Sequence, residues 1–153
     1  FAKVLVDNDS PYLKSIILNK GSKDKVKLGM AIVDGSYLVG KIIEVNFTNS
    51  RALLLSDLNS KIPVLLEPFD MHAVLSGTGQ NFGIIEYTKE EYEYLMKGDV
   101  IVYTSGQGGL FKPGVPVGKL TTEDDNRRLI NFFSDFKQLD YVKIVSYNIG
   151  ANN

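Results

Sequence analysis

The sequence contains no cysteine and only one histidine, His72. Both facts limit the catalytic and metal-binding sites that the chain can form. Without cysteine the chain has no disulfides, no thiolate nucleophile and no soft-metal thiolate site. The formal net charge is -1 at pH 7, and the basic residues are spread along the chain. Since no basic stripe is available to neutralise a phosphate backbone, we expect no nucleic-acid partner.

Long apolar runs are also missing from the chain. No run reaches the roughly 18 residues that span a bilayer, and no signal-peptide core is present. The chain begins at Phe1 instead of Met, and we interpret it as a soluble fragment. A chain of 153 residues buries roughly 70% of its unfolded surface, which suits one ordinary core or two small cores with a shared interface.

Short apolar runs bounded by turn residues recur at the spacing typical of β-sandwiches and barrels. Residues 52–55 are continuously apolar and are predicted to be buried on both faces. Residues 89–96 are predicted to form a short helical turn. We therefore predict an all-β fold, with strands at 4–6, 15–18, 30–33, 38–45, 52–55, 62–66, 72–75, 83–87, 100–103, 115–120 and 141–147.

The glycine-rich stretch from Lys97 to Leu120 is predicted to form a bent hairpin. Pro116 falls inside its second strand, where proline is tolerated at an edge or a bulge. Val-Gly-Lys opens a strand both here, at 117–119, and upstream, at 39–41. This echo indicates two related barrels of about 70 residues each, which are too small to be comfortably stable alone and should pack together.

Candidate catalytic residues are few. Ser105, His72 and either Asp57 or Asp99 are the members available for the triad of a trypsin-like double-barrel hydrolase. However, no nucleophile-elbow motif surrounds Ser105, and the alternation of MHAVL gives His72 a solvent-facing strand position. The acidic pairs at 7 and 9, 90 and 91, and 124 and 125 lack the offsets of a calcium loop. We predict that the protein is not an enzyme and has no cofactor and no metal site.

Exposed aromatic side chains are then the candidate functional groups, because a strand-rich domain without a catalytic set acts through its surface. Tyr37 is expected at a hairpin tip, and Leu110 and Phe111 in the glycine-rich turn. Phe132 and Phe133 are expected near the predicted loop from Thr121 to Asp140. Adjacent residues of a strand point to opposite faces, so one of these two phenylalanines is expected to be exposed. These five residues are the predicted partner-binding set.

Several motifs occur in an order that resembles the extracytoplasmic domain of the rod shape-determining protein MreC family, over nearly the whole chain. The downstream motifs are Gly98-Asp99, Thr104-Ser105-Gly106, Gly108-Gly109, Phe111, Pro113-Gly114 and Pro116-Val117-Gly118. The upstream motifs are Lys20-Gly21-Ser22, Gly29-Met30, Val39-Gly40 and Asn49-Ser50-Arg51, followed by Leu54, Leu55 and Asp57. Lys112 between Phe111 and Pro113, and Ser56 before Asp57, depart from the family pattern.

The resemblance implies two packed barrels of the six-stranded type. The first is expected over residues 13–69 and the second over 70–150, completed by the N-terminal strand at 1–12. It also implies a non-enzymatic scaffold of the cell-elongation machinery that maintains rod shape, self-associates as a homodimer or larger assembly, and lies at the periplasmic or extracytoplasmic face of the cytoplasmic membrane, anchored by an upstream helix.

The partners that the resemblance implies are a class B penicillin-binding transpeptidase, which binding would activate for peptidoglycan synthesis, and MreD, MreB and RodA. Two alternatives stay open. One is the trypsin-like double-barrel hydrolase, and the other is a module that binds peptidoglycan fragments. A pocket lined by titratable residues would favour the first, and a polar groove with aromatic platforms would favour the second.

Overall fold

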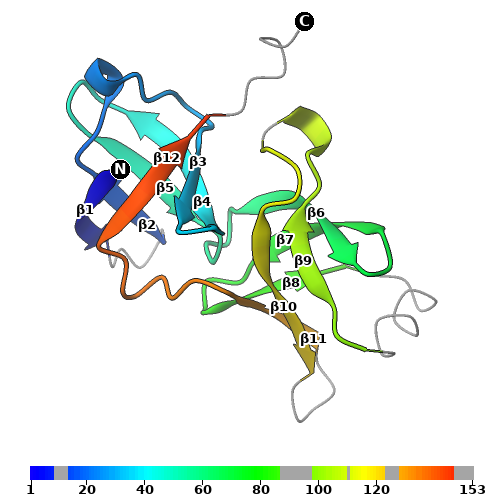
Figure 1. Ribbon diagram of the computed structural model, residues 1–153. Coiled ribbons are helices and arrows are strands. Elements are labelled where there is room, and N and C mark those ends of the chain that lie inside the picture. Colours follow the sequence, from blue (N-terminus) through cyan, green and yellow to red (C-terminus); the bar gives the residue numbers. More distant parts are fainter. Residues whose placement is uncertain (9–13, 87–97, 110, 123–127, 147–153) are drawn as a thin grey trace, which may run out of the picture.

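The computed structural model describes residues 1–8, 14–86, 98–109, 111–122 and 128–146, which form twelve strands in two closed barrels (Figure 1). The strands are β1 (Ala2–Asn8), β2 (Ser15–Leu18), β3 (Ala31–Asp34), β4 (Tyr37–Val45), β5 (Ser50–Leu54), β6 (Lys61–Glu67), β7 (Met71–Gly77), β8 (Phe82–Ile85), β9 (Ile101–Thr104), β10 (Pro116–Thr122), β11 (Arg128–Phe132) and β12 (Tyr141–Val145). Two short 3-10 turns, η1 (Ser22–Asp24) and η2 (Gln107–Gly109), lie between strands. The all-β prediction is confirmed, whereas the helical turn predicted at 89–96 lies outside the described residues.

Each barrel is an antiparallel ring of six strands. Barrel 1 has the order β1-β12-β3-β4-β5-β2, and barrel 2 has the order β6-β7-β8-β11-β10-β9. The prediction of two six-stranded barrels is confirmed. In the described part of the chain, none of the helical segments has the length and apolar character needed to cross a membrane.

The predicted domain boundaries are wrong. The N-terminal strand β1 belongs to barrel 1, where it pairs with β2 and β12, and does not complete the second barrel. Strand β6, predicted in the first barrel, belongs to barrel 2, and the C-terminal strand β12 belongs to barrel 1. Alternation along a strand determines which face is buried but does not specify which strands lie beside it.

One strand of barrel 2 was also missed. Residues 128–132 fall inside the predicted loop from Thr121 to Asp140, but they form β11, which pairs with β10 and β8. The predicted strand position of Pro116 is confirmed, and the β9–β10 register shifts directly after this residue, as expected for proline at a bulge.

The two Val-Gly-Lys strands occupy equivalent places, which confirms the predicted relation between the barrels. In barrel 1, Ile32 pairs with Gly40 and Val33 with Leu38, so that Val39 is skipped. In barrel 2, Val102 pairs with Gly118 and Tyr103 with Pro116, so that Val117 is skipped in the same way. A Cβ at Gly40 would lie 2.0 Å from the Leu53 carbonyl oxygen, and one at Gly118 would lie 2.4 Å from that of Asn131. Both glycines therefore let the neighbouring strand approach.

The correspondence holds around both rings. Strands β1 to β6 match β7 to β12 in order, with equivalent neighbours on each side. The sixth strand of each repeat, however, closes the barrel of the other repeat: β6 closes barrel 2 and β12 closes barrel 1. Each barrel thus contains five strands from one repeat and one from the other, and the chain crosses between the barrels after β5 and again after β11.

The two barrels pack together as the sequence predicts. One apolar core lies inside barrel 1 and includes Ile16, Ile42 and Val142. The core of barrel 2 continues into the interface, where Val33 and Leu38 of barrel 1 join it. Residues 52–55 are all buried, as predicted from their continuous apolar run. The shared core makes the barrel pair a single folded body.

Candidate partner-binding surfaces

The β3–β4 hairpin of barrel 1 and the β11–β12 connection bring two exposed aromatic side chains together. Tyr37 begins β4 at the hairpin tip and is 40% exposed, whereas Phe133 follows β11 and is 36% exposed. Their ring centroids lie 5.1 Å apart with 37° between the planes. Both are predicted partner-binding residues, and the predicted hairpin-tip position of Tyr37 is confirmed. We call Tyr37 and Phe133, with the adjacent Asp34 and Ser134, the hairpin surface.

A hydrogen bond between the barrels holds the hairpin surface in place. The Ser134 hydroxyl donates to Asp34 Oδ2 at 2.6 Å across 100 residues of sequence. Ser134 is buried and Asp34 is half-buried, so water competes little for this bond. The two rings thus sit on a support that is formed by both barrels.

Phe132 lies behind this surface. Its side chain is half-buried, packs against the core of barrel 2 and stacks on Phe136 with centroids 5.0 Å apart. The expectation that one of the adjacent phenylalanines is exposed is confirmed, and the exposed one is Phe133. A pocket of 260 Å³ is lined by Asn81 and residues 132–136.

The prediction that Phe111 is an exposed anchor is wrong. Phe111 is 2% exposed and lines an apolar pocket of 340 Å³ between the barrels with Leu38 and Val115. Thr104 folds the glycine-rich loop inward, because its hydroxyl donates to the Lys112 carbonyl at 2.6 Å and accepts the Val115 N–H at 2.9 Å. Leu110 lies outside the described residues.

A second surface, which the sequence reasoning missed, lies on barrel 2. Leu65 of β6 pairs with His72 on one side and Tyr103 on the other, and Pro63 pairs with Val74. Val74 is 52% exposed and His72 is also exposed, while the other three are half-buried. We call these five residues the β6 surface. Burial alternates along β6, and Pro63 and Leu65 face outward. The sequence carries no sign of this alternation, because residues 62–66 are all apolar.

The structure does not assemble the candidate catalytic triad. His72 and Ser105 are separated by strand β6, a distance of roughly 10 Å at normal strand spacing. The buried Asp57 carboxylate accepts the backbone N–H groups of Lys14 and Asn59, each at 2.7 Å. Asp99 pairs with Lys119 at 3.6 Å, and Ser105 Oγ accepts the Gln107 N–H. In the described structure, Asp57 therefore fixes neighbouring backbone segments through hydrogen bonds, and Asp99 forms a surface ion pair.

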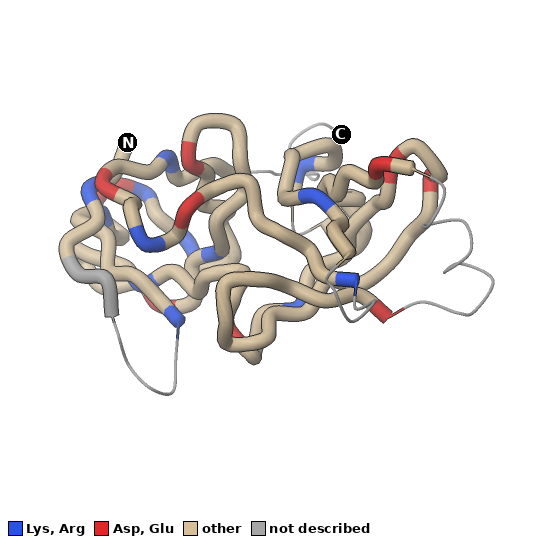
Figure 2. Tube along the Cα trace, turned by 90° about the horizontal axis from the view of Figure 1, so that it is seen from below, with Lys and Arg blue, Asp and Glu red and all other residues tan. Residues whose placement is uncertain are grey.

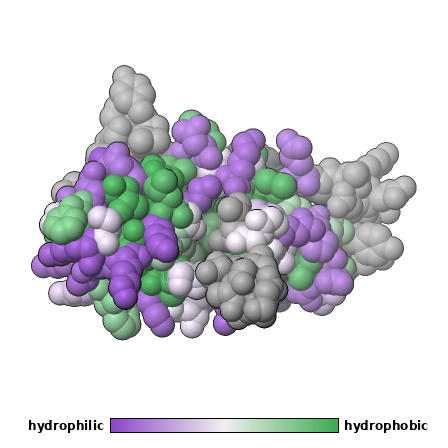
Figure 3. All heavy atoms as spheres, turned by 90° about the horizontal axis from the view of Figure 1, so that it is seen from above, coloured by the Kyte–Doolittle hydropathy of each residue, from purple (hydrophilic) through white to green (hydrophobic). Residues whose placement is uncertain are grey.

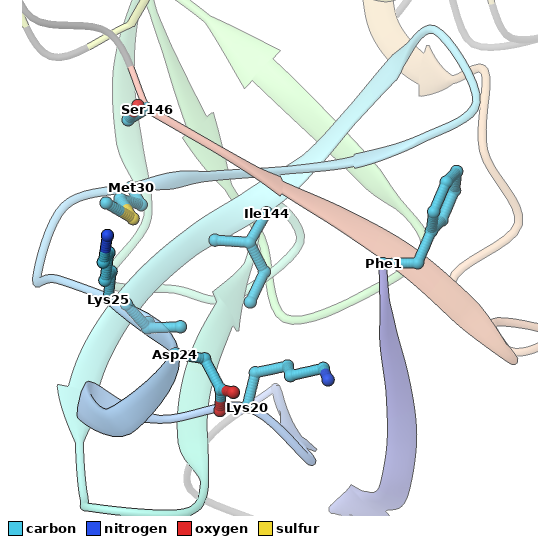
Figure 4. A pocket seen from close by; sticks show the side chains of 8 residues that line it. Phe1, Lys20, Asp24, Lys25, Met30, Ile144 and Ser146 are labelled. Atoms are coloured by element: carbon cyan, nitrogen blue, oxygen red, sulfur yellow. The ribbon is translucent and has the colours of Figure 1, made fainter.

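Among the residues that the structure describes, charges do not gather into a single recognition patch. Lys and Arg alternate with Asp and Glu over both barrels (Figure 2). A polar pocket of 360 Å³ opens on barrel 1 and is lined in part by Lys20, Asp24 and Lys25 (Figure 4). Ile144 and Met30 form apolar parts of its wall. In a space-filling view, apolar side chains emerge between hydrophilic ones at several separate places (Figure 3).

These observations define a double-barrel, all-β domain. Its distinctive features are the hairpin surface, the β6 surface and the apolar interface between the barrels. The family model described as "Rod shape-determining protein MreC, barrel core" matches residues 4–146. Two cell shape-determining MreC proteins are similar: that of Cereibacter sphaeroides is 34% identical over 93% of this chain and 47% of its own length, and that of Caulobacter vibrioides is 31% identical over 95% and 42%. The chain thus belongs to the MreC family, and it spans less than half the length of these curated relatives.

Solved structures show the same fold. The crystal structure of MreC from Pseudomonas aeruginosa superposes with a TM-score of 0.83 at 25% identity, covering 95% of this chain and 97% of that one. MreC in the complex between the penicillin-binding protein PBP2 and MreC from Helicobacter pylori superposes with a TM-score of 0.63 at 13% identity, covering 92% and 93%. A major periplasmic domain of the cell shape-determining filament MreC superposes with a TM-score of 0.71 at 16% identity, covering 92% of both chains.

Proposed function

We propose that this chain is the non-enzymatic, periplasmic scaffold domain of a rod shape-determining protein in the cell-elongation machinery. It binds a class B penicillin-binding transpeptidase, associates with copies of itself, and is anchored by an upstream helix. Membership of the MreC family carries this proposal, and the fold shared with MreC from the PBP2 complex supports the choice of partner. MreD, MreB and RodA are further proposed partners.

We place the transpeptidase on the hairpin surface. Tyr37 and Phe133 supply exposed aromatic area, and their ring contact holds both side chains in fixed positions. Aromatic anchors that are already ordered lose little side-chain entropy on binding, and such residues dominate protein interfaces. The part-buried hydrogen bond from Ser134 to Asp34 supports the surface beneath the two rings before a partner binds.

A protein partner fits these observations better than a small ligand. The pocket beside the hairpin surface measures 260 Å³, which is below the roughly 300–1,000 Å³ typical of small-molecule sites. Protein partners instead use flatter aromatic surfaces with a polar rim, here provided by the half-buried Asp34 and the exposed Asp135. Binding would activate the transpeptidase if the hairpin surface has higher affinity for the active arrangement of that enzyme than for the inactive one.

The test measures the affinity of the purified periplasmic region of the cognate transpeptidase for this chain by calorimetry. The Tyr37→Ala/Phe133→Ala variant is expected to bind about 30-fold more weakly, which is the loss typical of an interface hot spot. Phe47→Ala is the matched control, because Phe47 is 69% exposed and lies on barrel 1 between β4 and β5. Unchanged affinity of the double variant, or an equal loss with Val74→Asp on the β6 surface, would contradict the proposed location.

A further inference from the structure

The exchanged sixth strands, β6 and β12, occupy equivalent positions but are held very differently. Among the described residues, β6 makes six register pairs with β7 and four with β9. Strand β12 makes two register pairs with β1 and three with β3. Because backbone pairing stabilises a strand residue by residue, barrel 1 is closed by a much weaker strand than barrel 2.

Side-chain packing shows the same difference. Leu66 of β6 pairs with Val102, and Ile144 of β12 pairs with the equivalent Ile32. Leu66 is completely buried, whereas Ile144 is half-buried and lines the 360 Å³ pocket of barrel 1 (Figure 4). On the other face of β12, Val145 lines the 340 Å³ pocket between the barrels. Val142 near the start of β12 is buried, but pockets border the C-terminal residues of the strand on both faces, so this end has fewer contacts to lose when the strand leaves.

Residues 137–140 of the connection that carries β12 are the candidate hinge of this strand. Phe136 packs against both apolar cores and fixes the first half of the connection. Lys137, Gln138 and Asp140 are exposed, and the Asp140 carbonyl accepts the Val4 N–H at 2.8 Å. A change of backbone direction within residues 137–140 would release β12 with the loss of the Val4–Asp140 bond and of the Leu139 contact with the core of barrel 1, while Phe136 keeps its packing.

We propose that β12 is exchanged between copies of this chain, so that the β12 of one copy closes barrel 1 of another. The inference rests on the self-association included in the proposed function and gives it a structural basis. A β12 from a second copy carries the same residues and makes the same register pairs with β1 and β3, so exchange conserves the ladder. The balance between closed monomers and exchanged assemblies is then governed by the hinge and by protein concentration.

The experiment uses engineered cysteines, since the chain has none of its own. Lys3 of β1 and Tyr141 of β12 are register partners, and both are exposed. Directly opposed strand residues have the Cα separation that a disulfide requires. The single variants Lys3→Cys and Tyr141→Cys, one carrying a size tag, are mixed at high concentration, oxidised, and analysed by mass for the mixed disulfide between two chains. The matched control is a mixture of Lys61→Cys and Ser76→Cys, register partners across β6 and β7.

If β12 is exchanged between copies, the mixture of Lys3→Cys and Tyr141→Cys should yield at least ten times as much mixed disulfide as the control mixture. It also predicts that the double variant Lys3→Cys/Tyr141→Cys, oxidised within one chain as a monomer, loses self-association in sedimentation velocity. The oxidised double variant Lys61→Cys/Ser76→Cys should retain it. Assemblies that form without the mixed disulfide, or that persist in the locked Lys3→Cys/Tyr141→Cys variant, would overturn the exchange but leave self-association standing. A wild-type chain that is monomeric at every concentration would overturn both.

Discussion

Barrels 1 and 2 have the same ring of strands but differ in how firmly each is closed. Barrel 2 receives β6, whose Ile62, Val64 and Leu66 are all buried and which lies between long ladders. Barrel 1 receives β12, which has five residues, one of them the buried Val142, and pockets on both faces beside Ile144 and Val145. Equivalent topology therefore does not imply equal local stability, because stability follows the number of paired and buried residues.

The difference also separates two roles. Barrel 2 is the more stably closed of the two barrels. Its closing strand is buried, and its core extends into the interface. Barrel 1 contributes the β3–β4 hairpin that holds Tyr37 against Phe133. The hairpin surface thus needs both barrels in contact, whereas the exchange of β12 needs only a weak closure of barrel 1.

Truncating equivalent residues of the two closing strands gives the largest expected difference. Leu66→Ala removes a fully buried side chain and should lower the free energy of unfolding by about 2–5 kcal/mol. Ile144→Ala removes a half-buried side chain that already borders a pocket, so the loss should be less than half as large. Urea denaturation of both variants measures the two values. Equal losses would mean that β12 closes barrel 1 as firmly as β6 closes barrel 2.

Adding a methyl group to the equivalent glycines tests the repeat itself. Gly40→Ala and Gly118→Ala each place a Cβ within 2.4 Å of a backbone carbonyl oxygen and should each cost about 1–3 kcal/mol through forced backbone movement. Gly98→Ala is the control, because nothing lies within 4 Å of its added Cβ. Thermal unfolding followed by circular dichroism reports all three. If one of the first two variants is as stable as Gly98→Ala, that barrel does not need the close approach.

Removing the hydrogen bond between the barrels should have the smallest effect on stability. Ser134→Ala deletes the donor to Asp34 and leaves a half-buried carboxylate short of one partner, at a cost of about 1–2 kcal/mol. The exposed Ser36→Ala, on the same hairpin, should stay within about 0.5 kcal/mol of the wild type. Denaturant midpoints compare the two variants. A Ser134→Ala protein as stable as the control would show that the apolar interface alone joins the barrels.

The sequence predicts the local features of this fold well. The strand periodicity, the Val-Gly-Lys echo and the bulge at Pro116 are all confirmed, because each depends on residues close together in the chain. The closing of barrel 2 by β6 and of barrel 1 by β12 within one chain was not predicted, because it depends on pairing between strands that are distant in the sequence. Strand β11 was missed because its apolar residues, Leu129 and Ile130, follow a polar run and precede two phenylalanines that were assigned to a loop.

The candidate surface was predictable in part. Tyr37 and Phe133 were recognised as separate exposed aromatics, but their contact arises from the crossing of the chain between barrels. The burial of Phe111 was not predictable from its glycine-rich surroundings, since it depends on the two hydrogen bonds of the Thr104 side chain. The β6 surface was missed because its five residues come from three strands whose order in the ring was not known.

We propose that the hairpin surface binds and activates a transpeptidase. The most direct test measures the peptidoglycan-crosslinking rate of the cognate class B penicillin-binding protein at a saturating concentration of this chain. We expect the wild-type chain to raise the rate and the Tyr37→Ala/Phe133→Ala variant at the same concentration to leave it unchanged. A rate that the double variant raises as much as the wild type, or that the wild type leaves unchanged at saturation, would contradict it.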